Sequence, residues 1–376
     1  MSTKNHSDKS PKVAIFYDWL NQWGGAEKVL LNLLTIYPQA QLFTLVHDPT
    51  KTKWLPKNLK IHTSFLQKLP QALNNFPLYT PLYDLALEQF DFTEFDLVIS
   101  TTSTQGHCLL TPASTLFLCY YHNINRHLYS SKNSLLKPFL KIYQKLDSYY
   151  STRPDYSFTN SKTVQTRLKN TYNKNPTVIN PGIDTQFFNP TSSSNPLKNL
   201  PQNYYLSVGR LVSHKKVDLA IRACQKLHKN LIIVGQGRQE NTLKNLAKKS
   251  PNIIFLKTFS DTKLRYLYQH AQALICPQIE DFGLTPLESL ACGTPVIALN
   301  KGGFTETLNN KTAQFFNHQT VSSLSKAILK FETKSSQNYF SKKICRQQAT
   351  HFSASQFMLN FRQIVDQLWT NWNQKK

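Results

Sequence analysis

The chain has 376 residues, enough for two domains of roughly 100–200 residues each. Hydrophobic residues make up 40% and aromatic residues 12%, which is typical of a globular protein and excludes a disordered one. The net charge of +23 indicates an anionic partner: nucleic acid, an anionic membrane or a phosphorylated substrate. Because no block of like charge occurs, a lysine- and asparagine-rich background composition is the alternative to a basic face.

The first half of the sequence alternates strand-like and helix-like stretches. An apolar run at 12–20 predicts a buried strand of the parallel type, ending at Asp18. A glycine loop and helically spaced apolar residues follow at 21–38. Further strands are predicted within 40–48, 95–101, 115–122, 155–161 and 176–184. The alternation favours a doubly wound α/β domain.

The pattern restarts after residues 189–202, whose Pro, Ser and Asn content is typical of a linker. Strands are predicted within 203–210, 230–237, 252–260, 271–277 and 294–299, and helices at 217–227 and 261–271. A last helix at 353–372 has apolar residues at positions 357, 358, 361, 364, 365 and 368, a face that needs a partner surface. We therefore predict domains at 1–190 and 200–354, with 355–376 returning to the first.

Cysteine spacing and the apolar profile indicate the compartment. The six cysteines include no Cys-x-x-Cys pair, which argues against a zinc site or disulfides and for a reducing cytosol. The N-terminal stretch lacks the apolar core of a signal peptide, and no stretch approaches the ~18 apolar residues of a transmembrane helix. We expect a cytoplasmic protein.

The stretch EDFGLTPLE, residues 280–288, has two interpretations. Thr285 and Glu288 form a Thr-x-x-Glu capping box, and Gly293 suits the end of the helix that follows. This structural interpretation leaves Glu280 and Gly283 unexplained. The alternative is a ligand site, because free amides at a helix start attract phosphate and ionised carboxylates accept hydrogen bonds from ligand hydroxyls.

Cations are available for such a ligand. Arg210 follows a predicted strand, and Lys215 and Lys216 come shortly after it. Arg binds phosphate through its planar fork and Lys as a point charge. A solvated basic turn is the structural alternative. A cationic turn at one strand end and a carboxylate loop at another suit a nucleotide diphosphate sugar.

These motifs carry a family resemblance. The C-terminal half resembles family 4 glycosyltransferases of the GT-B fold, which have two Rossmann-like domains, through SVGRLVSHKKVDLAI, IIVGQG, EDFGLTPLE and ACGTPVIALNKGGFTETL. The N-terminal half is similar to the mannosyltransferase branch through DWLNQWGGAEKVL, LFTLVHDP, TSFLQKLP, LALEQFDFTEFDLVIS and NSKTVQTRLK. The resemblance covers about residues 12–370 in the same order and spacing.

The resemblance implies roles by position. Glu280 would hold donor-sugar hydroxyls and Glu288 the ribose, while Arg210 and Lys215 would stabilise the leaving diphosphate, with Lys216 as the alternative to Lys215. The implied donor-binding residues are Gly24, Gly25, Arg210, Lys215, Gly235, Glu280, Phe282, Gly283, Leu284, Thr285 and Glu288. The implied catalytic residues are His122, Arg210, Lys215 and Glu280, and those on the acceptor side are Asp18, Trp19, His122 and Arg126.

The stretch YYHNINRHLYS departs from the family pattern, which often reads His-Thr-Pro-x-Arg. His122 and Arg126 match, but Asn123 and Ile124 replace Thr-Pro. The resemblance implies that His122 contacts the sugar near its reacting carbon. The structural alternative is a hydrogen-bonded histidine at a strand end.

The resemblance further implies a retaining enzyme that needs neither cofactor nor metal, and the sequence contains no Asp-x-Asp motif. We expect transfer of a hexose, mannose from GDP-mannose, to a glycan or lipid-linked acceptor in cell-surface polysaccharide synthesis, without nucleic acid as a partner. The protein would be cytoplasmic and peripheral on the inner face of the plasma membrane. The alternatives are a UDP-sugar donor, another GT-B enzyme such as an epimerase or phosphorylase, and a non-enzymatic binder of anionic ligands.

Overall fold

A computed structural model describes residues 11–129, 137–191, 197, 200–257 and 260–375. The chain divides into two compact units, residues 1–180 with 358–376 (unit 1) and residues 181–357 (unit 2). The predicted boundaries lie near 190–200 and 354–355, whereas this division lies at Asn180–Pro181 and Phe357–Met358. Within the predicted linker, residues 192–196 and 198–199 lie outside the described residues.

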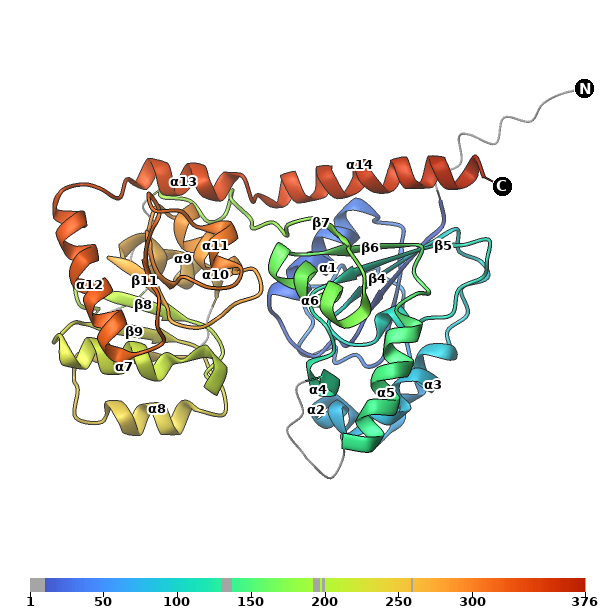
Figure 1. Cartoon of the computed structure of the whole chain (residues 1–376), viewed down its shortest axis with the longest axis horizontal. Helices are drawn as coiled ribbons and strands as arrows, with labels where there is room; N and C mark the ends of the chain where they lie inside the picture. Colours follow the sequence, from blue (N-terminus) through green and yellow to red (C-terminus); the bar gives the residue numbers. More distant parts are fainter. Residues whose placement is uncertain (1–10, 130–136, 192–196, 198–199, 258–259, 376) are drawn as a thin grey trace, which may run out of the picture. The chain divides into compact units, whose positions relative to one another are not determined.

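Unit 1 is built on a parallel seven-stranded sheet in the order β3-β2-β1-β4-β5-β6-β7 (Figure 1). Its strands are β1 (Val13–Tyr17), β2 (Gln41–Thr44), β3 (Ile61–Thr63), β4 (Leu97–Thr102), β5 (Leu116–Tyr121), β6 (Tyr156–Thr159) and β7 (Thr177–Val178). Its helices are α1 (Gly25–Ile36), α2 (Ala72–Asn75), α3 (Tyr83–Glu88), α4 (Arg126–Tyr129), α5 (Lys137–Tyr150) and α6 (Lys162–Tyr172), with 3-10 turns η1 (Phe65–Lys68), η2 (Phe76–Leu82) and η3 (Gly106–Cys108). The short edge strand β3 was not predicted from the sequence.

Unit 2 is built on a parallel six-stranded sheet in the order β10-β9-β8-β11-β12-β13. Its strands are β8 (Tyr205–Val208), β9 (Leu231–Val234), β10 (Ile253–Leu256), β11 (Ala273–Cys276), β12 (Val296–Leu299) and β13 (Ala313–Phe316). The other elements are the 3-10 turn η4 (Ser213–Lys215) and helices α7 (Val217–Lys226), α8 (Glu240–Ala247), α9 (Asp261–His270), α10 (Leu284–Ala291), α11 (Phe304–Thr307), α12 (Val321–Ser336) and α13 (Lys342–Thr350). The last helix, α14 (Ala354–Asn373), begins in unit 2 and belongs to unit 1 from Met358 onward.

The strands of unit 2 are largely apolar, because both faces of the sheet are covered. Leu206 and Tyr205 are neighbours in β8, yet they belong to two separate buried clusters, one on each face. Ile232 and Ile233 of β9 divide in the same way. This arrangement is typical of a doubly wound sheet with helices on both sides, and it confirms the predicted α/β architecture.

Strand order reverses at one point in each sheet, between β1 and β4 in unit 1 and between β8 and β11 in unit 2. In sheets of this type, ligands bind outside the carboxyl ends of the strands at the reversal. Each unit therefore has a defined place where a site is expected.

The last helix packs on unit 1, as predicted from its apolar face. Phe361 is fully buried, and its ring lies 5.7 Å from that of Phe158 and 6.4 Å from that of Tyr120, centroid to centroid. Val365, one turn further, is also buried. Burial of this face accounts for the attachment of residues 358–376 to the first unit.

All six cysteines are buried and free, which confirms the expectation that the chain has no disulfides. Burial raises the pKa of each thiol: Cys108, Cys119, Cys224, Cys276, Cys292 and Cys345. None of the helices within the described residues combines the length and the apolar character that crossing a bilayer requires.

Candidate active site

In unit 2, the cationic turn and the carboxylate loop meet at the strand-order reversal. Lys215 lies on η4 after β8, and Glu280 lies in the loop after β11. The Lys215 Nζ atom is 2.5 Å from Oε2 of Glu280, and Nε2 of Gln278 donates to the same oxygen at 3.2 Å. The Lys215 and Glu280 side chains are 18% and 26% exposed, so a ligand can reach both charges.

The loop of Glu280 leads into α10 through a glycine that no other residue could replace without strain. Gly283 has φ of 101°, and a Cβ there would lie 2.8 Å from the ring of Phe304. Gly283 is the N-cap of α10 and provides no side-chain cap. The first amides of α10 therefore lack a capping side chain, and together with the helix dipole they favour an anion.

The capping-box interpretation of Thr285 and Glu288 is wrong. Helix α10 begins at Leu284, so Thr285 is inside its first turn and is not the N-cap. The predicted end is confirmed: the Gly293 amide donates to the carbonyl of Leu290 at 2.9 Å, with φ of 86° at Gly293.

Glu288 lies on the buried side of α10. The Tyr268 hydroxyl donates to its Oε2 atom at 3.1 Å. Burial is the main cause that raises the pKa of Tyr268 well above its ordinary value. The negative charge of Glu288 raises this pKa further. The ribose role of Glu288 stays a prediction. Phe282 is also buried, with its ring packed against Phe352, so only its backbone is available to a ligand.

Gly302 and Gly303, which follow β12, contact the backbone of the Glu280 loop. The sequence analysis did not predict this contact. The Gly303 amide donates to the carbonyl of Glu280 at 2.8 Å. A Cβ at position 303 would lie 2.4 Å from Cα of Phe282. Two adjacent glycines shortly after a buried strand were the available signal for this close backbone approach.

The remaining predicted donor residues of unit 2 lie along the same carboxyl edge of the sheet. Arg210 is exposed in the loop after β8. Gly235 follows β9 with φ of 146°, and a Cβ there would lie 2.0 Å from the Gly209 carbonyl oxygen. Close packing of the two backbones therefore requires glycine at position 235. Arg238, exposed three residues later, is a further cation that was not singled out from the sequence.

In unit 1, Asp18 lies at the strand-order reversal between β1 and β4. The hydroxyl of Thr102 donates to its Oδ1 atom and the amide of Ser103 to Oδ2, both at 2.6 Å. Burial raises the pKa of Asp18 to about 6, although these hydrogen bonds oppose the shift. The neighbouring Trp19 is partly buried against the apolar cluster beneath β2 and α3.

Gly24 and Gly25 start helix α1, where Gly24 is the N-cap without a side-chain cap. Glu27, in the first turn, is buried and was missed by the sequence analysis. Its Oε1 atom accepts from the hydroxyl of Tyr17 at 2.6 Å and from Nε2 of Gln22 at 3.1 Å. A glutamate in a first helical turn usually faces solvent, so nothing in the sequence pattern indicated its burial.

His122 is buried directly after β5, and its Nε2 atom is hydrogen-bonded to Oγ1 of Thr101 at 2.8 Å. Burial lowers the pKa of His122 to about 3, so the ring is neutral near pH 7. This environment agrees with the structural alternative, and its catalytic role stays a prediction. Arg126 is exposed at the start of α4.

We expect His122 to make the protein sensitive to acid. Between about pH 6.5 and 3 the unfolded chain binds a proton on this ring that the folded chain excludes, so stability falls as the pH falls. Wild type should lose about 2 kcal/mol more than His122→Gln between pH 7 and 5. Urea unfolding at both pH values measures this difference. The raised pKa of Asp18 acts in the opposite sense but is common to both proteins, and equal losses would contradict the burial argument.

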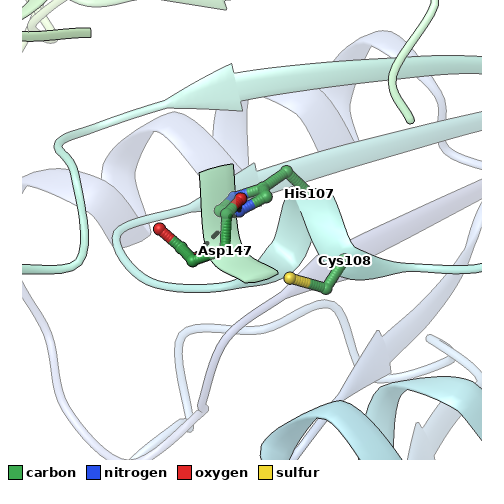
Figure 2. A group of neighbouring side chains, drawn as sticks. All are labelled: His107, Cys108 and Asp147. Carbon is green, nitrogen blue, oxygen red and sulfur yellow. Dashed lines mark hydrogen bonds and ion pairs between the residues drawn. The ribbon is translucent and has the colours of Figure 1, made fainter. Parts of the chain in front are cut away.

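A buried polar group lies beside Asp18 in unit 1. Ligand-type atoms of His107, Cys108 and Asp147 lie within 4.8 Å of one another (Figure 2). The His107 Nε2 atom is 3.1 Å from Oδ1 of Asp147, whose Oδ2 accepts from the hydroxyls of Tyr172 at 2.6 Å and Tyr129 at 2.9 Å. We interpret the group as a buried carboxylate that fixes α5 to η3, because two phenols and an imidazole surround it.

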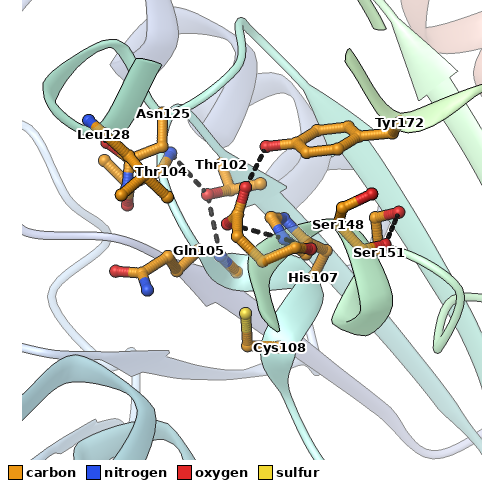
Figure 3. Close-up of polar contacts among 12 residues, drawn as sticks. Thr102, Thr104, Gln105, His107, Cys108, Asn125, Leu128, Ser148, Ser151 and Tyr172 are labelled. Carbon is orange, nitrogen blue, oxygen red and sulfur yellow. Dashed lines mark hydrogen bonds and ion pairs between the residues drawn. The ribbon is translucent and has the colours of Figure 1, made fainter. Parts of the chain in front are cut away.

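This group continues toward the reversal of strand order in unit 1. In Figure 3, Thr102 lies to the left of His107 and Tyr172. The Thr102 Oγ1 atom accepts from the amides of Thr104 and Gly106, both at 3.0 Å, and donates to Asp18. The predicted acceptor-side carboxylate is therefore held by a network that reaches η3.

Two doubly wound units of this kind make up the GT-B fold, which the chain shares with solved glycosyltransferase structures. Residues 189–348 match the family model described as glycosyl transferases group 1. Over these residues the chain is similar to group 1 glycosyltransferases, and its relatives include mannosyltransferases.

One curated relative is similar along most of the chain, and another along about a third of it. The alpha-1,3/1,6-mannosyltransferase ALG2 of Dictyostelium discoideum is 26% identical over 381 residues, covering 86% of this chain and 90% of that protein. The D-inositol 3-phosphate glycosyltransferase of Mycolicibacterium smegmatis is 34% identical over 140 residues, 34% of this chain and 32% of that protein.

Solved structures share the fold. Sucrose-phosphate synthase from Thermosynechococcus elongatus has a TM-score of 0.79 at 18% identity, covering 96% of this chain and 100% of that one. Anabaena Alr3699/HepE in complex with UDP and glucose has a TM-score of 0.74 at 18% identity, covering 95% and 100%. At this identity the likeness concerns the fold alone.

Proposed function

We propose that this chain transfers mannose from GDP-mannose to a glycan or lipid-linked acceptor in cell-surface polysaccharide synthesis. The contact between Lys215 and Glu280 at the strand-order reversal of unit 2 is the observation that supports donor binding there. The similarity to the Dictyostelium mannosyltransferase over 86% of the chain supports mannose as the sugar. The protein would work at the cytoplasmic face of a membrane that supplies the acceptor.

The charge pair suggests how a donor binds. Without ligand, the Lys215 ammonium and the Glu280 carboxylate neutralise each other. A nucleotide sugar offers both charges better partners, because its diphosphate attracts Lys215 while its sugar hydroxyls donate to Glu280. The amides at the start of α10 add hydrogen bonds to the diphosphate.

The reaction follows from the same charges. As the bond from the sugar to the diphosphate breaks, negative charge grows on the leaving diphosphate and positive charge on the sugar. Lys215, Arg210 and the α10 amides stabilise the leaving group. Its phosphate accepts the proton of the attacking acceptor hydroxyl on the same face of the sugar, and the configuration of the anomeric carbon is retained.

We propose that this chemistry needs no metal. Two side-chain cations and a helix N-terminus can supply the charge that a divalent ion would otherwise contribute. The His107, Cys108 and Asp147 group is fully buried in unit 1, so its ligand atoms cannot contact a diphosphate bound at Lys215.

A UDP-sugar is the second candidate donor. The Anabaena protein, which shares the fold at a TM-score of 0.74, was solved in complex with UDP and glucose. Among the described residues of unit 2, we assign no side chain to the recognition of guanine or of uracil.

Calorimetric titration with GDP-mannose, UDP-glucose, UDP-N-acetylglucosamine, GDP and UDP tests the donor. We expect binding of GDP and GDP-mannose only, with a loss of roughly 10–100-fold in Lys215→Gln, because one charge-assisted contact disappears. Lys216→Gln is the matched control and should bind as wild type does, since Glu280 is in contact with Lys215. Preference for a UDP-sugar would refute the mannose assignment, and unchanged affinity in Lys215→Gln would refute the site.

A further inference from the structure

Helix α5 of unit 1 exposes a row of large apolar side chains. Ile142, Leu146 and Tyr149 are 60%, 40% and 70% exposed, and Tyr143 is 36% exposed. Ile142, Leu146 and Tyr149 follow one another at spacings of four and three residues, so they lie on one face of the helix. Scattered exposed apolar residues are ordinary, but four within about two turns of one helix indicate a contact surface.

The same surface is basic. Lys141 and Lys145 are also exposed, each directly before an apolar residue of this row, Ile142 or Leu146. The acid of this segment, Asp147, is buried and points inward. Among the described side chains of α5, residues 140–150, the exposed face therefore combines positive and apolar groups without a negative one.

The opposite face of α5 is already occupied. Asp147 accepts from the hydroxyls of Tyr172 and Tyr129, and Nε2 of Gln144 donates to the carbonyl of Leu128 at 2.9 Å. These contacts fix the rotation of the helix, so the apolar row cannot turn inward. A partner outside unit 1 is needed to cover it.

We propose that the outward face of α5 (Lys141, Ile142, Tyr143, Lys145, Leu146 and Tyr149) docks on an anionic lipid bilayer. Lysines attract acidic headgroups, while Ile, Leu and Tyr side chains enter the boundary between headgroups and acyl chains. Charge complementarity favours lipid over a second copy of the chain, because two copies would bring like charges together at a net charge of +23. This inference rests on the proposed function in one respect: an enzyme with a lipid-linked acceptor must reach the membrane that holds this acceptor.

Flotation of the full chain with vesicles tests this surface without donor or acceptor, so a wrong sugar assignment cannot affect the result. We expect binding to phosphatidylcholine vesicles containing phosphatidylglycerol and little binding to pure phosphatidylcholine. The double variant Lys141→Gln/Lys145→Gln should bind roughly thirty-fold more weakly. Ile142→Ser/Leu146→Ser should lose at least about ten-fold, and thermal melting should show that both variants remain folded because these side chains are exposed.

The matched control lies on α12 of unit 2, where Leu329 is 49% exposed beside Lys330 but forms no apolar row. Leu329→Ser/Lys330→Gln should bind vesicles as wild type does. Equal loss in this control would show that binding is diffuse electrostatics and would overturn the proposal. So would full binding by both α5 variants, or a dimer in sedimentation that the α5 variants dissociate.

Discussion

Replacement of Glu280 by alanine is expected to lower kcat of sugar transfer by roughly 100–1,000-fold, as loss of one preorganised transition-state contact does in other enzymes. The carboxylate would hold the sugar hydroxyls while charge develops, and its removal also leaves the Lys215 cation unopposed. The fold should remain intact, because a partly exposed ion pair contributes only about 0–1 kcal/mol. Steady-state kinetics with saturating donor measures kcat, and thermal melting checks the fold.

Glu332→Ala is the control for Glu280→Ala. Glu332 forms a comparable ion pair in the same unit, at 2.7 Å from Nζ of Lys229, and also accepts from the hydroxyl of Tyr205. It lies on α12 and not in the Glu280 loop. Its removal should alter stability slightly and transfer hardly at all. Full activity in Glu280→Ala would refute the role assigned to that carboxylate.

Truncation of Phe361 is expected to have the largest effect on stability. Phe361→Ala should cost about 3–5 kcal/mol, because it leaves a cavity between α14 and the rings of Phe158 and Tyr120. The melting temperature should fall by roughly 10 °C for a unit of this size. Removal of residues 355–376 should destabilise the protein further, since it exposes the whole surface under the helix.

Leu359→Ala on the same helix is the control for Phe361→Ala. Leu359 is 52% exposed, so its truncation removes no core contact and should leave the melting temperature within a few degrees. Calorimetry of both variants gives the comparison. An unchanged melting temperature in Phe361→Ala would contradict the packing of α14 on unit 1.

Most strands of both units could be predicted because parallel strands buried on two faces are continuous apolar runs. Two strands were not predicted: β3, which has three residues and is only partly buried, and β13, whose four residues include Gln314 and so do not form an apolar run. Helix α5 has the same kind of amphipathic pattern as α14 but was not assigned. In α5 the exposed face is itself apolar, so the pattern did not separate the buried side from the outer one.

The candidate site could be predicted where it depends on strand ends. Lys215 and Glu280 are 65 residues apart, yet they meet because parallel strands end at one edge of the sheet. Two contacts could not be predicted: the hydrogen bond from the Gly303 amide to the Glu280 carbonyl, and the pairing of His107 with Asp147. Both depend on how particular loops and helices lie against one another. The capping box was wrong for a local reason: Gly283 lets the helix begin at Leu284, before Thr285.

The buried thiols have a practical consequence for labelling chemistry. Maleimides and related reagents react with accessible thiolates, and all six native cysteines are buried with raised pKa values. A cysteine introduced at an exposed position would therefore react far faster than any native one. A fluorophore pair, one on each unit, could be attached without first removing the native cysteines, and it would report whether the units change separation when a nucleotide sugar binds.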